Sequence, residues 1–345
     1  MSSKVSPAGT TFIASTKRNL PSLTGIRAIA ALLVFWHHGS SLYGGVSSGM
    51  VGVSLFYILS GFVMAWTDRL DDTDARFYQR RFARIYPAYA AAAVIALGYA
   101  AITIGVSWKD FFAFTLLQSW VPDQTVYFAA SAVFWSLSCE AFFYLAFPLI
   151  RRVTRQISSR GLWFLAAGAG LVSVAIASFG VGVPESPQLT WAVVVFPVVR
   201  LPEFVIGVCL GSLMARGWRI NIPLALAWPL AAVGVGAAII APYSLSRYAV
   251  TLIPFAVLIV ALAGADLRGV RTFAGARLMV RLGEWSYCFY LIHLVAIMVT
   301  VSISTRLGLP VWATLTVALA GAVLAAWLLH RFVETPGNTK LRPTA

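Results

Sequence analysis

Long apolar runs recur along the whole sequence, and they limit the possible folds more than any other feature. About 20 apolar residues let an α-helix cross the roughly 30 Å hydrocarbon core of a bilayer. Because lipid offers the backbone no hydrogen-bond partner, such runs must be helical. They are predicted at 22–42, 49–67, 87–106, 131–150, 161–180, 189–213, 222–241, 247–264, 283–305 and 309–330. We therefore expect an all-α, polytopic membrane protein with about ten transmembrane helices.

Composition and charge agree with this expectation. Only 11% of residues are charged, against about 25% in soluble domains. Of the 26 Lys and Arg residues, all but five fall on the side of the two termini once these spans are assigned. The positive-inside rule makes that side cytoplasmic. A surface attracted to anionic lipid accounts for most of the charge, and nothing indicates nucleic-acid binding.

The domain organisation is simple. We expect a flexible cytoplasmic tail at 1–21, a single transmembrane domain at 22–336 and a second cytoplasmic tail at 337–345. Pro87 suits the first turn of the third helix, and the small residues of the second span permit close helix packing. The aromatic segment 108–121 is predicted to lie at the outer interface or to re-enter the membrane.

The sixth span contains Pro197, Arg200, Pro202 and Glu203. Two prolines and two charges inside a membrane helix predict a broken helix that lines a cavity. We expect Arg200 and Glu203 to pair with each other.

The first span carries unusual polar residues. Arg27 and His38 lie eleven positions apart, which is about three helical turns, so both face one side about 16 Å apart along the axis. An ionisable group at membrane depth is costly and usually functional. A neutral imidazole can act as a general base. The alternative is a helix-to-helix hydrogen bond; His37 points elsewhere and is the weaker candidate.

Glu140 lies in the outer half of the fourth span, at a depth similar to that of His38. A carboxylate there would orient the imidazole, or it would form a structural ion pair with Arg27 or Arg200. Its neighbour Cys139 is expected to be a packing residue. His293 is either a cavity wall or a packed histidine. The three cysteines show no metal-ligand spacing, so no metal is predicted.

A basic cluster precedes the third span. Guanidinium groups at the start of a helix suit phosphates, and interleaved tyrosines can stack on a base; the alternative is membrane topology alone. The candidate cofactor-binding residues are Arg80, Arg81, Arg84, Tyr86 and Tyr89.

In this order, several stretches resemble the acyltransferase 3 family of bacterial integral-membrane O-acyltransferases. The resemblance rests on Leu23–Arg27 with His38, Phe56–Phe62, Arg81–Tyr89, Trp135–Glu140, Ser286–His293 and Arg331–Pro336. It implies a multi-pass protein of the bacterial cytoplasmic membrane that uses acetyl-CoA or another acyl-CoA as co-substrate, with no tightly bound cofactor. The acceptor would be a hydroxyl of a carbohydrate or of a glycosylated or macrolide natural product.

The resemblance also implies that Arg27 and His38 are needed for activity and that Arg81 and Arg84 lie near the CoA phosphates. We hypothesise that His38 takes the acceptor proton and that Glu140 stabilises the resulting imidazolium. The candidate substrate-binding residues are His37, Ser60, Trp135 and His293. An acyl-imidazole intermediate stays open. The alternatives are a transporter or exporter of about ten spans, and a translocator that hands acyl groups to a separate enzyme.

Overall fold

The structure is a computed structural model, and it describes residues 19–45, 48–69 and 72–342. Within these ranges the chain forms helices and no strand, which confirms the all-α prediction. The long helices are α1 (Pro21–Ser41), α2 (Val51–Thr67), α3 (Asp74–Thr103), α5 (Trp135–Gln156), α6 (Ser159–Ser178), α8 (Pro197–Ala215), α9 (Leu224–Ile240), α11 (Leu252–Leu267), α12 (Arg277–Leu307) and α13 (Val311–Leu329). The short ones are η1 (Trp108–Thr115), η2 (Gln118–Trp120), α4 (Gln124–Tyr127), α7 (Pro187–Thr190), η3 (Trp191–Val195), α10 (Tyr243–Ser246), η4 (Ala249–Thr251), η5 (His330–Glu334) and α14 (Thr335–Leu341).

Each predicted apolar run overlaps one of the long helices. Six helical segments of the described chain are long and apolar enough to cross a membrane: 74–103, 159–178, 187–215, 249–267, 277–307 and 311–341. Helices α2 and α9 are apolar but shorter. The number of ten crossings and the cytoplasmic position of the termini stay predictions.

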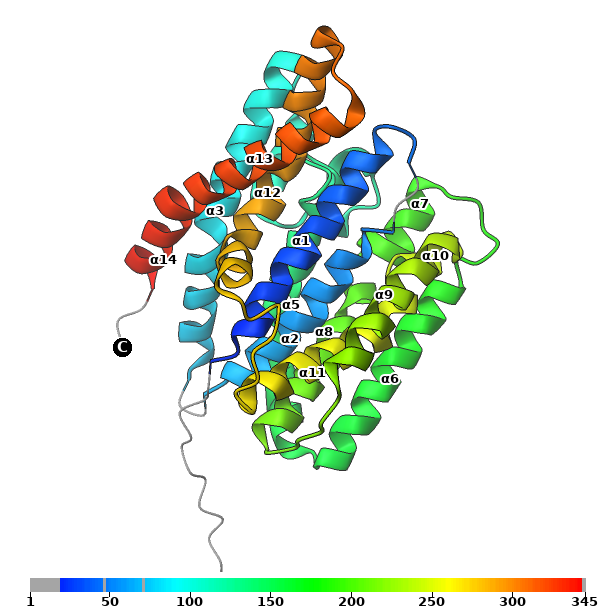
Figure 1. Ribbon diagram of the computed structural model, residues 1–345, viewed down its shortest axis with the longest axis vertical. Helices are drawn as coiled ribbons and strands as arrows, with labels where there is room; N and C mark the ends of the chain where they lie inside the picture. The colour runs from blue at the N-terminus through cyan, green and yellow to red at the C-terminus, as the bar shows by residue number, and fades with distance from the viewer. Residues whose placement is uncertain (1–18, 46–47, 70–71, 343–345) are drawn as a thin grey trace, which may run out of the picture.

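Helices α1, α2 and α5 lie between two groups of helices, with α3, α12 and α13 on one side and α6, α9 and α11 on the other (Figure 1). Glycines let α2 and α8 approach closely, as the small residues of the second span predicted. A Cβ on Gly61 would lie 2.1 Å from the Phe204 oxygen, and one on Gly207 would lie 1.9 Å from the Ile58 oxygen. No side chain fits at these two positions, so the glycines determine how closely α2 and α8 approach each other.

Close packing at a glycine also joins α1 to α12. A Cβ on Gly283 would lie 1.9 Å from the backbone oxygen of Thr24. This contact holds Arg27, one turn further along α1, beside the tyrosines of α12. Close backbone packing therefore positions one wall of the cavity described below.

Helix α3 begins at Asp74, thirteen residues before the predicted start at 87. The side chain of Thr73 caps the helix by accepting a hydrogen bond from the Arg76 amide at 3.3 Å. Pro87 thus lies in the helix interior, and its expected place in the first turn is wrong. The reason is that charged residues extend an apolar helix into the polar region when a good N-cap is available. The added turns carry the arginine cluster.

Ion pairs lock the start of α3 against the ends of α2 and α5. Arg151 lies 3.3 Å from Asp68 and 2.5 Å from Asp74, and Arg155 lies 2.6 Å from Asp68. Arg151 is buried, and a charge buried without its partners would cost several kcal/mol, about 3–5 in typical proteins. This network fixes the rotation of α3 and so the direction of its arginines.

The predicted break in the sixth span is confirmed. The π-helical turn η3 ends at Val195, the next residue Phe196 has a non-helical ψ of 124°, and α8 starts at Pro197. Arg200 and Glu203 are both fully buried and pair at 2.5 Å, as expected. The guanidinium of Arg200 also lies 4.5 Å from the centre of the Tyr248 ring. The broken helix thus encloses a buried ion pair, in which the Nη2 of Arg200 has no hydrogen-bond partner among the described residues.

The segment after α3 forms two short 3₁₀ turns, η1 and η2. Eight residues at about 2.0 Å each cover roughly 16 Å, too little to cross a bilayer. The segment is therefore no transmembrane helix, in agreement with the prediction. At the other end of the chain, α14 takes in most of the segment assigned to a tail and packs against α3.

Candidate active site

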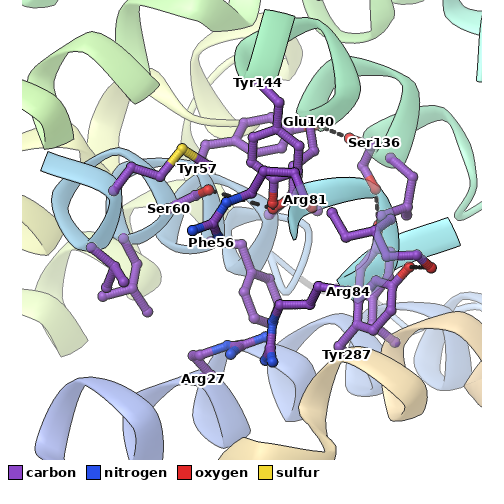
Figure 2. A pocket seen from close by; sticks show the side chains of 17 residues that line it. Arg27, Phe56, Tyr57, Ser60, Arg81, Arg84, Ser136, Glu140, Tyr144 and Tyr287 are labelled. Atoms are coloured by element: carbon purple, nitrogen blue, oxygen red, sulfur yellow. Dashed lines mark hydrogen bonds between the residues drawn. The ribbon is translucent and has the colours of Figure 1, made fainter. Parts of the chain in front are cut away.

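A cavity of about 230 Å³ lies between α1, α2, α3, α5 and α12 (Figure 2). Its polar lining residues are Arg27, Tyr57, Ser60, Arg81, Arg84, Ser136, Glu140, Tyr144, Tyr287 and Tyr290. Apolar side chains such as Phe56 complete the wall. The described residues that line it include none from the broken helix at 187–215, which differs from the sequence-based expectation.

Three arginines reach this cavity from two helices. Arg81 and Arg84 lie three residues apart on α3 and therefore share one face, while Arg27 comes from α1 (Figure 2). No hydrogen bond joins Arg27 or Arg81 to another residue that the structure describes, and the Nε of Arg81 is buried and unpartnered. The Arg81 guanidinium instead lies over the rings of Phe77 and Tyr144, at 5.4 and 5.9 Å. Cations held in this way retain free donors for an anion.

Glu140 carries the one carboxylate among the described residues of the cavity lining. It accepts hydrogen bonds from Tyr144 and, at 3.4 Å, from Ser60. Three guanidinium groups therefore face one carboxylate in a space of low dielectric, where unbalanced charge is costly. Arg84 is closer to the surface, with 41% of its side chain exposed, and its Nη2 lies 3.8 Å from Glu334. The lining keeps a positive excess that suits an anionic ligand.

His38 lies against α12. Its Nδ1 is 3.0 Å from the Val34 oxygen and 3.2 Å from the Nε2 of His293. His293 is fully buried, and its Nδ1 is 2.8 Å from the oxygen of Tyr290. Tyr290 lines the cavity, and its hydroxyl lies 2.7 Å from Ser136. Tyr290 thus links the cavity to the histidine pair.

The structure separates two residues that the sequence was expected to bring together. Glu140 lies among the arginines, and no hydrogen bond joins it to His38 in the described part of the chain. It also forms no ion pair with Arg27 or Arg200 there. The partner of His38 is His293. The position of a residue in the sequence gives its depth in the membrane only roughly, and it does not give the direction of its side chain. Helix α5 directs Glu140 toward α2 and α3.

Several predicted cofactor residues lie outside the cavity. Arg80 pairs with Asp72 in the ion-pair network. The hydroxyl of Tyr89, which is fully buried, donates to the oxygen of Ala113 at 2.6 Å. Tyr86 donates to the oxygen of Phe114 at 3.1 Å. These hydroxyl bonds hold the 3₁₀ segment η1 in place, and the Tyr86 ring stacks on that of Phe82 with ring centres 4.8 Å apart.

The candidate substrate residues divide in the same way. Ser60 lines the cavity, and His293 contacts His38. Trp135 is buried, with its ring 5.7 Å from the guanidinium of Arg200. His37 packs edge-on against His38 with ring centres 5.3 Å apart. Trp135 therefore belongs to the surroundings of the ion pair and not to the cavity.

The sequence reasoning did not assign the tyrosines of the lining. Tyr144 follows Glu140 by one helical turn, and Tyr287 and Tyr290 lie three residues apart. Both spacings place the side chains on one helix face, a signal that could have identified them. Tyr57 was not recognisable in this way, because its place depends on the packing of α2.

One group of residues near the cavity could hold a metal ion. Ligand atoms of Cys288, His330 and Glu334 lie within 4.8 Å of one another. Here the Glu334 carboxylate accepts from Cys288 at 3.1 Å and contacts His330 at 2.8 Å. With Arg84 also nearby, the group forms a hydrogen-bonded ion-pair network. Cys139 donates to the Val195 oxygen at 3.3 Å, as a packing residue would.

Comparison with known proteins adds independent information. A family described as "Acyltransferase domain" matches residues 20–331. The chain is 36% identical to Acyltransferase MdmB of Streptomyces mycarofaciens, over 92% of this chain and 91% of that protein. It is 29% identical to the exopolysaccharide production protein ExoZ of Rhizobium meliloti, over 84% and 89% of the two chains. A part covering 39% of this chain and 25% of the relative is 30% identical to the O-acetyltransferase OatA of Staphylococcus aureus. No solved structure matches the chain.

Proposed function

The chain belongs to the acyltransferase family whose domain covers residues 20–331, and we propose that it transfers an acyl group, acetyl by expectation, from acyl-CoA to a hydroxyl group. The acceptor is proposed to be a carbohydrate or a glycosylated or macrolide natural product. The relatives include an exopolysaccharide production protein and an O-acetyltransferase, which supports this class of acceptor. We place the enzyme in the bacterial cytoplasmic membrane.

The observation that carries the proposal is the excess of arginine in the cavity. Arg27, Arg81 and Arg84 face a single carboxylate, and Arg81 retains a buried, unpartnered donor. Guanidinium groups bind phosphates through paired, charge-assisted hydrogen bonds. The phosphates of CoA satisfy this requirement. The tyrosines that we expected to stack on the base lie elsewhere, so recognition is proposed to rest on the phosphates.

In the proposed reaction, the acceptor oxygen attacks the thioester carbonyl while its proton passes to His38. The carbon–sulfur bond then breaks, and the thiolate takes up that proton and leaves as CoA thiol. General-base assistance of this kind contributes about 10²- to 10⁴-fold. Tyr290 lines the cavity and its backbone oxygen contacts His293, so the thioester is proposed to approach His38 past Tyr290. Glu140 is assigned to the arginine end of the cavity and no longer to the imidazole.

The test uses purified protein in proteoliposomes with acetyl-CoA and candidate glycosides. We expect free thiol to appear only when both the protein and a suitable acceptor are present, with the acceptor gaining an acetyl ester. Uptake of an acceptor without thiol release would instead show a transporter. Thiol release that needs a second protein would show an acyl-group translocator.

A further inference from the structure

His38 and His293 form a hydrogen-bonded pair between α1 and α12. Their facing nitrogens are 3.2 Å apart, and their ring centres 5.1 Å. His293 is fully buried and stacks on Phe289, with ring planes 9° apart. A side chain held this firmly can fix the orientation of the ring that it contacts.

The backbone settles where the protons lie. The Nδ1 of His38 faces the carbonyl oxygen of Val34 at 3.0 Å, and the Nδ1 of His293 faces that of Tyr290 at 2.8 Å. Carbonyl oxygens only accept, so each Nδ1 carries a hydrogen, and a neutral imidazole has only one. The Nε2 of His293 is therefore an acceptor, and it faces the Nδ1–H of His38.

The opposite assignment fails on the same contacts. If the hydrogen of His38 were on Nε2, three acceptors would meet at one point: its own Nδ1, the Val34 oxygen and the Nε2 of His293. A proton on both nitrogens of His293 would place a full charge at a fully buried position, which is costly. With the hydrogen on Nδ1 of both rings, the oxygens of Val34 and Tyr290 and the Nε2 of His293 each face a donor, and His38 shares its Nδ1–H between two of them.

From this geometry we infer that His293 is a positioning residue, which accepts the Nδ1–H of His38 and so leaves the Nε2 of His38 as the basic nitrogen. No hydrogen bond holds that Nε2 among the residues that the structure describes. As Nε2 takes the acceptor proton, the Nδ1–H becomes a stronger donor to His293. His293 thus orients the base and stabilises its charged form, the role that the sequence had suggested for Glu140. The inference rests on the proposed function only in naming His38 as the base.

The first test needs no substrate. The chain has four histidines, so ¹⁵N-histidine NMR of the full-length protein is simple, and His38→Gln identifies the His38 signals. At a pH where the rings are neutral, we expect His38 to carry its hydrogen on Nδ1. A hydrogen on Nε2 would overturn the inference, whatever the protein catalyses.

The second test uses a set of variants at His293. His293→Gln places an amide oxygen near the position of Nε2 and can still accept from His38. His293→Asn reaches only the position of Nδ1, and His293→Phe keeps the ring packing but accepts nothing. We expect kcat to fall about 10- to 100-fold for Asn and Phe, and less for Gln, with an unchanged KM for acetyl-CoA. Thermal unfolding checks that each variant is folded.

Two results would contradict the positioning role: a Phe variant with the kcat of the wild type, or Gln and Asn variants that fall equally. Failure of the proposed function looks different. In that case His38→Gln would release thiol at the normal rate, while the NMR result would still show whether His293 fixes the ring.

Discussion

Replacing Arg81 by glutamine tests the arginine cavity. Arg81 is the most informative of the three arginines because its Nε is buried and already lacks a partner. A phosphate that binds there forms a hydrogen bond without breaking one in the protein. Arg84 differs, since it is 41% exposed and lies 3.8 Å from Glu334. Part of its attraction for a ligand is therefore offset by the loss of that ion pair.

The expected magnitude follows from this difference. A hydrogen bond to a charged group contributes about 1.5–3 kcal/mol, and each 1.4 kcal/mol is a factor of about ten in affinity. Arg81→Gln should therefore weaken CoA binding about 10- to 100-fold, and Arg84→Gln should weaken it less. Arg81→Lys should restore only part of the affinity, because an ammonium lacks the planar fork of a guanidinium.

Isothermal titration with CoA and the KM for acetyl-CoA are the two assays. Arg76→Gln is the matched control, since Arg76 is an exposed residue of the same helix that does not line the cavity. Equal affinities for the Arg81 variant and the wild type would refute the reasoning. An equal loss in the control would refute it as well, because it would point to general surface charge.

Two further predictions concern stability. Gly207→Ala should lower the melting temperature by several degrees, because the added Cβ would lie 1.9 Å from a backbone oxygen of α2. Gly236→Ala is the control, because Gly236 on α9 has open space around it, and its melting temperature should not change. Equal melting temperatures for the two variants would argue against close packing of α2 and α8. Hydrogen bonds from Lys109 and Thr125 lower the pKa of Asp123 from 3.8 to about 2. Ionised Asp123 therefore stabilises the folded protein fully above pH 3.8, and this stabilisation is lost as the pH falls toward 2. Amide exchange around residues 107–125 should accelerate in that range, and Asp123→Asn should remove the dependence; an unchanged profile in the variant would exclude Asp123 as the cause.

The sequence predicted the fold well, because membrane helices are set by local apolarity. The helical runs, the break at Phe196 and the pair of Arg200 with Glu203 could all be inferred from residues close together in the chain. The start of α3 could not be inferred from apolarity. It depends on the Thr73 cap and on ion pairs to residues of α5 that lie far away in sequence.

The candidate site was predictable in part. Arg27, Arg81 and Arg84 do meet in one cavity, with Ser60 and Glu140. Which side chains meet across helices depends on helix rotation, and the spacing along one helix does not give this. For that reason Tyr86 and Tyr89 were assigned to a ligand although they hold η1.

The partner of His38 shows the same limit. Glu140 was expected beside it from an estimate of depth, whereas the structure places His293 there. The contact joins residues 255 positions apart in the sequence. The packing of α1 against α12, which Gly283 permits, brings His38 and His293 together.

The most direct test of the central claim is the rate of thiol release from acetyl-CoA by His38→Ala, measured on protein that still binds CoA with normal affinity. We predict that release falls at least a hundredfold while binding and the melting temperature stay unchanged. Release at the wild-type rate would remove His38 as the base and contradict the proposed mechanism.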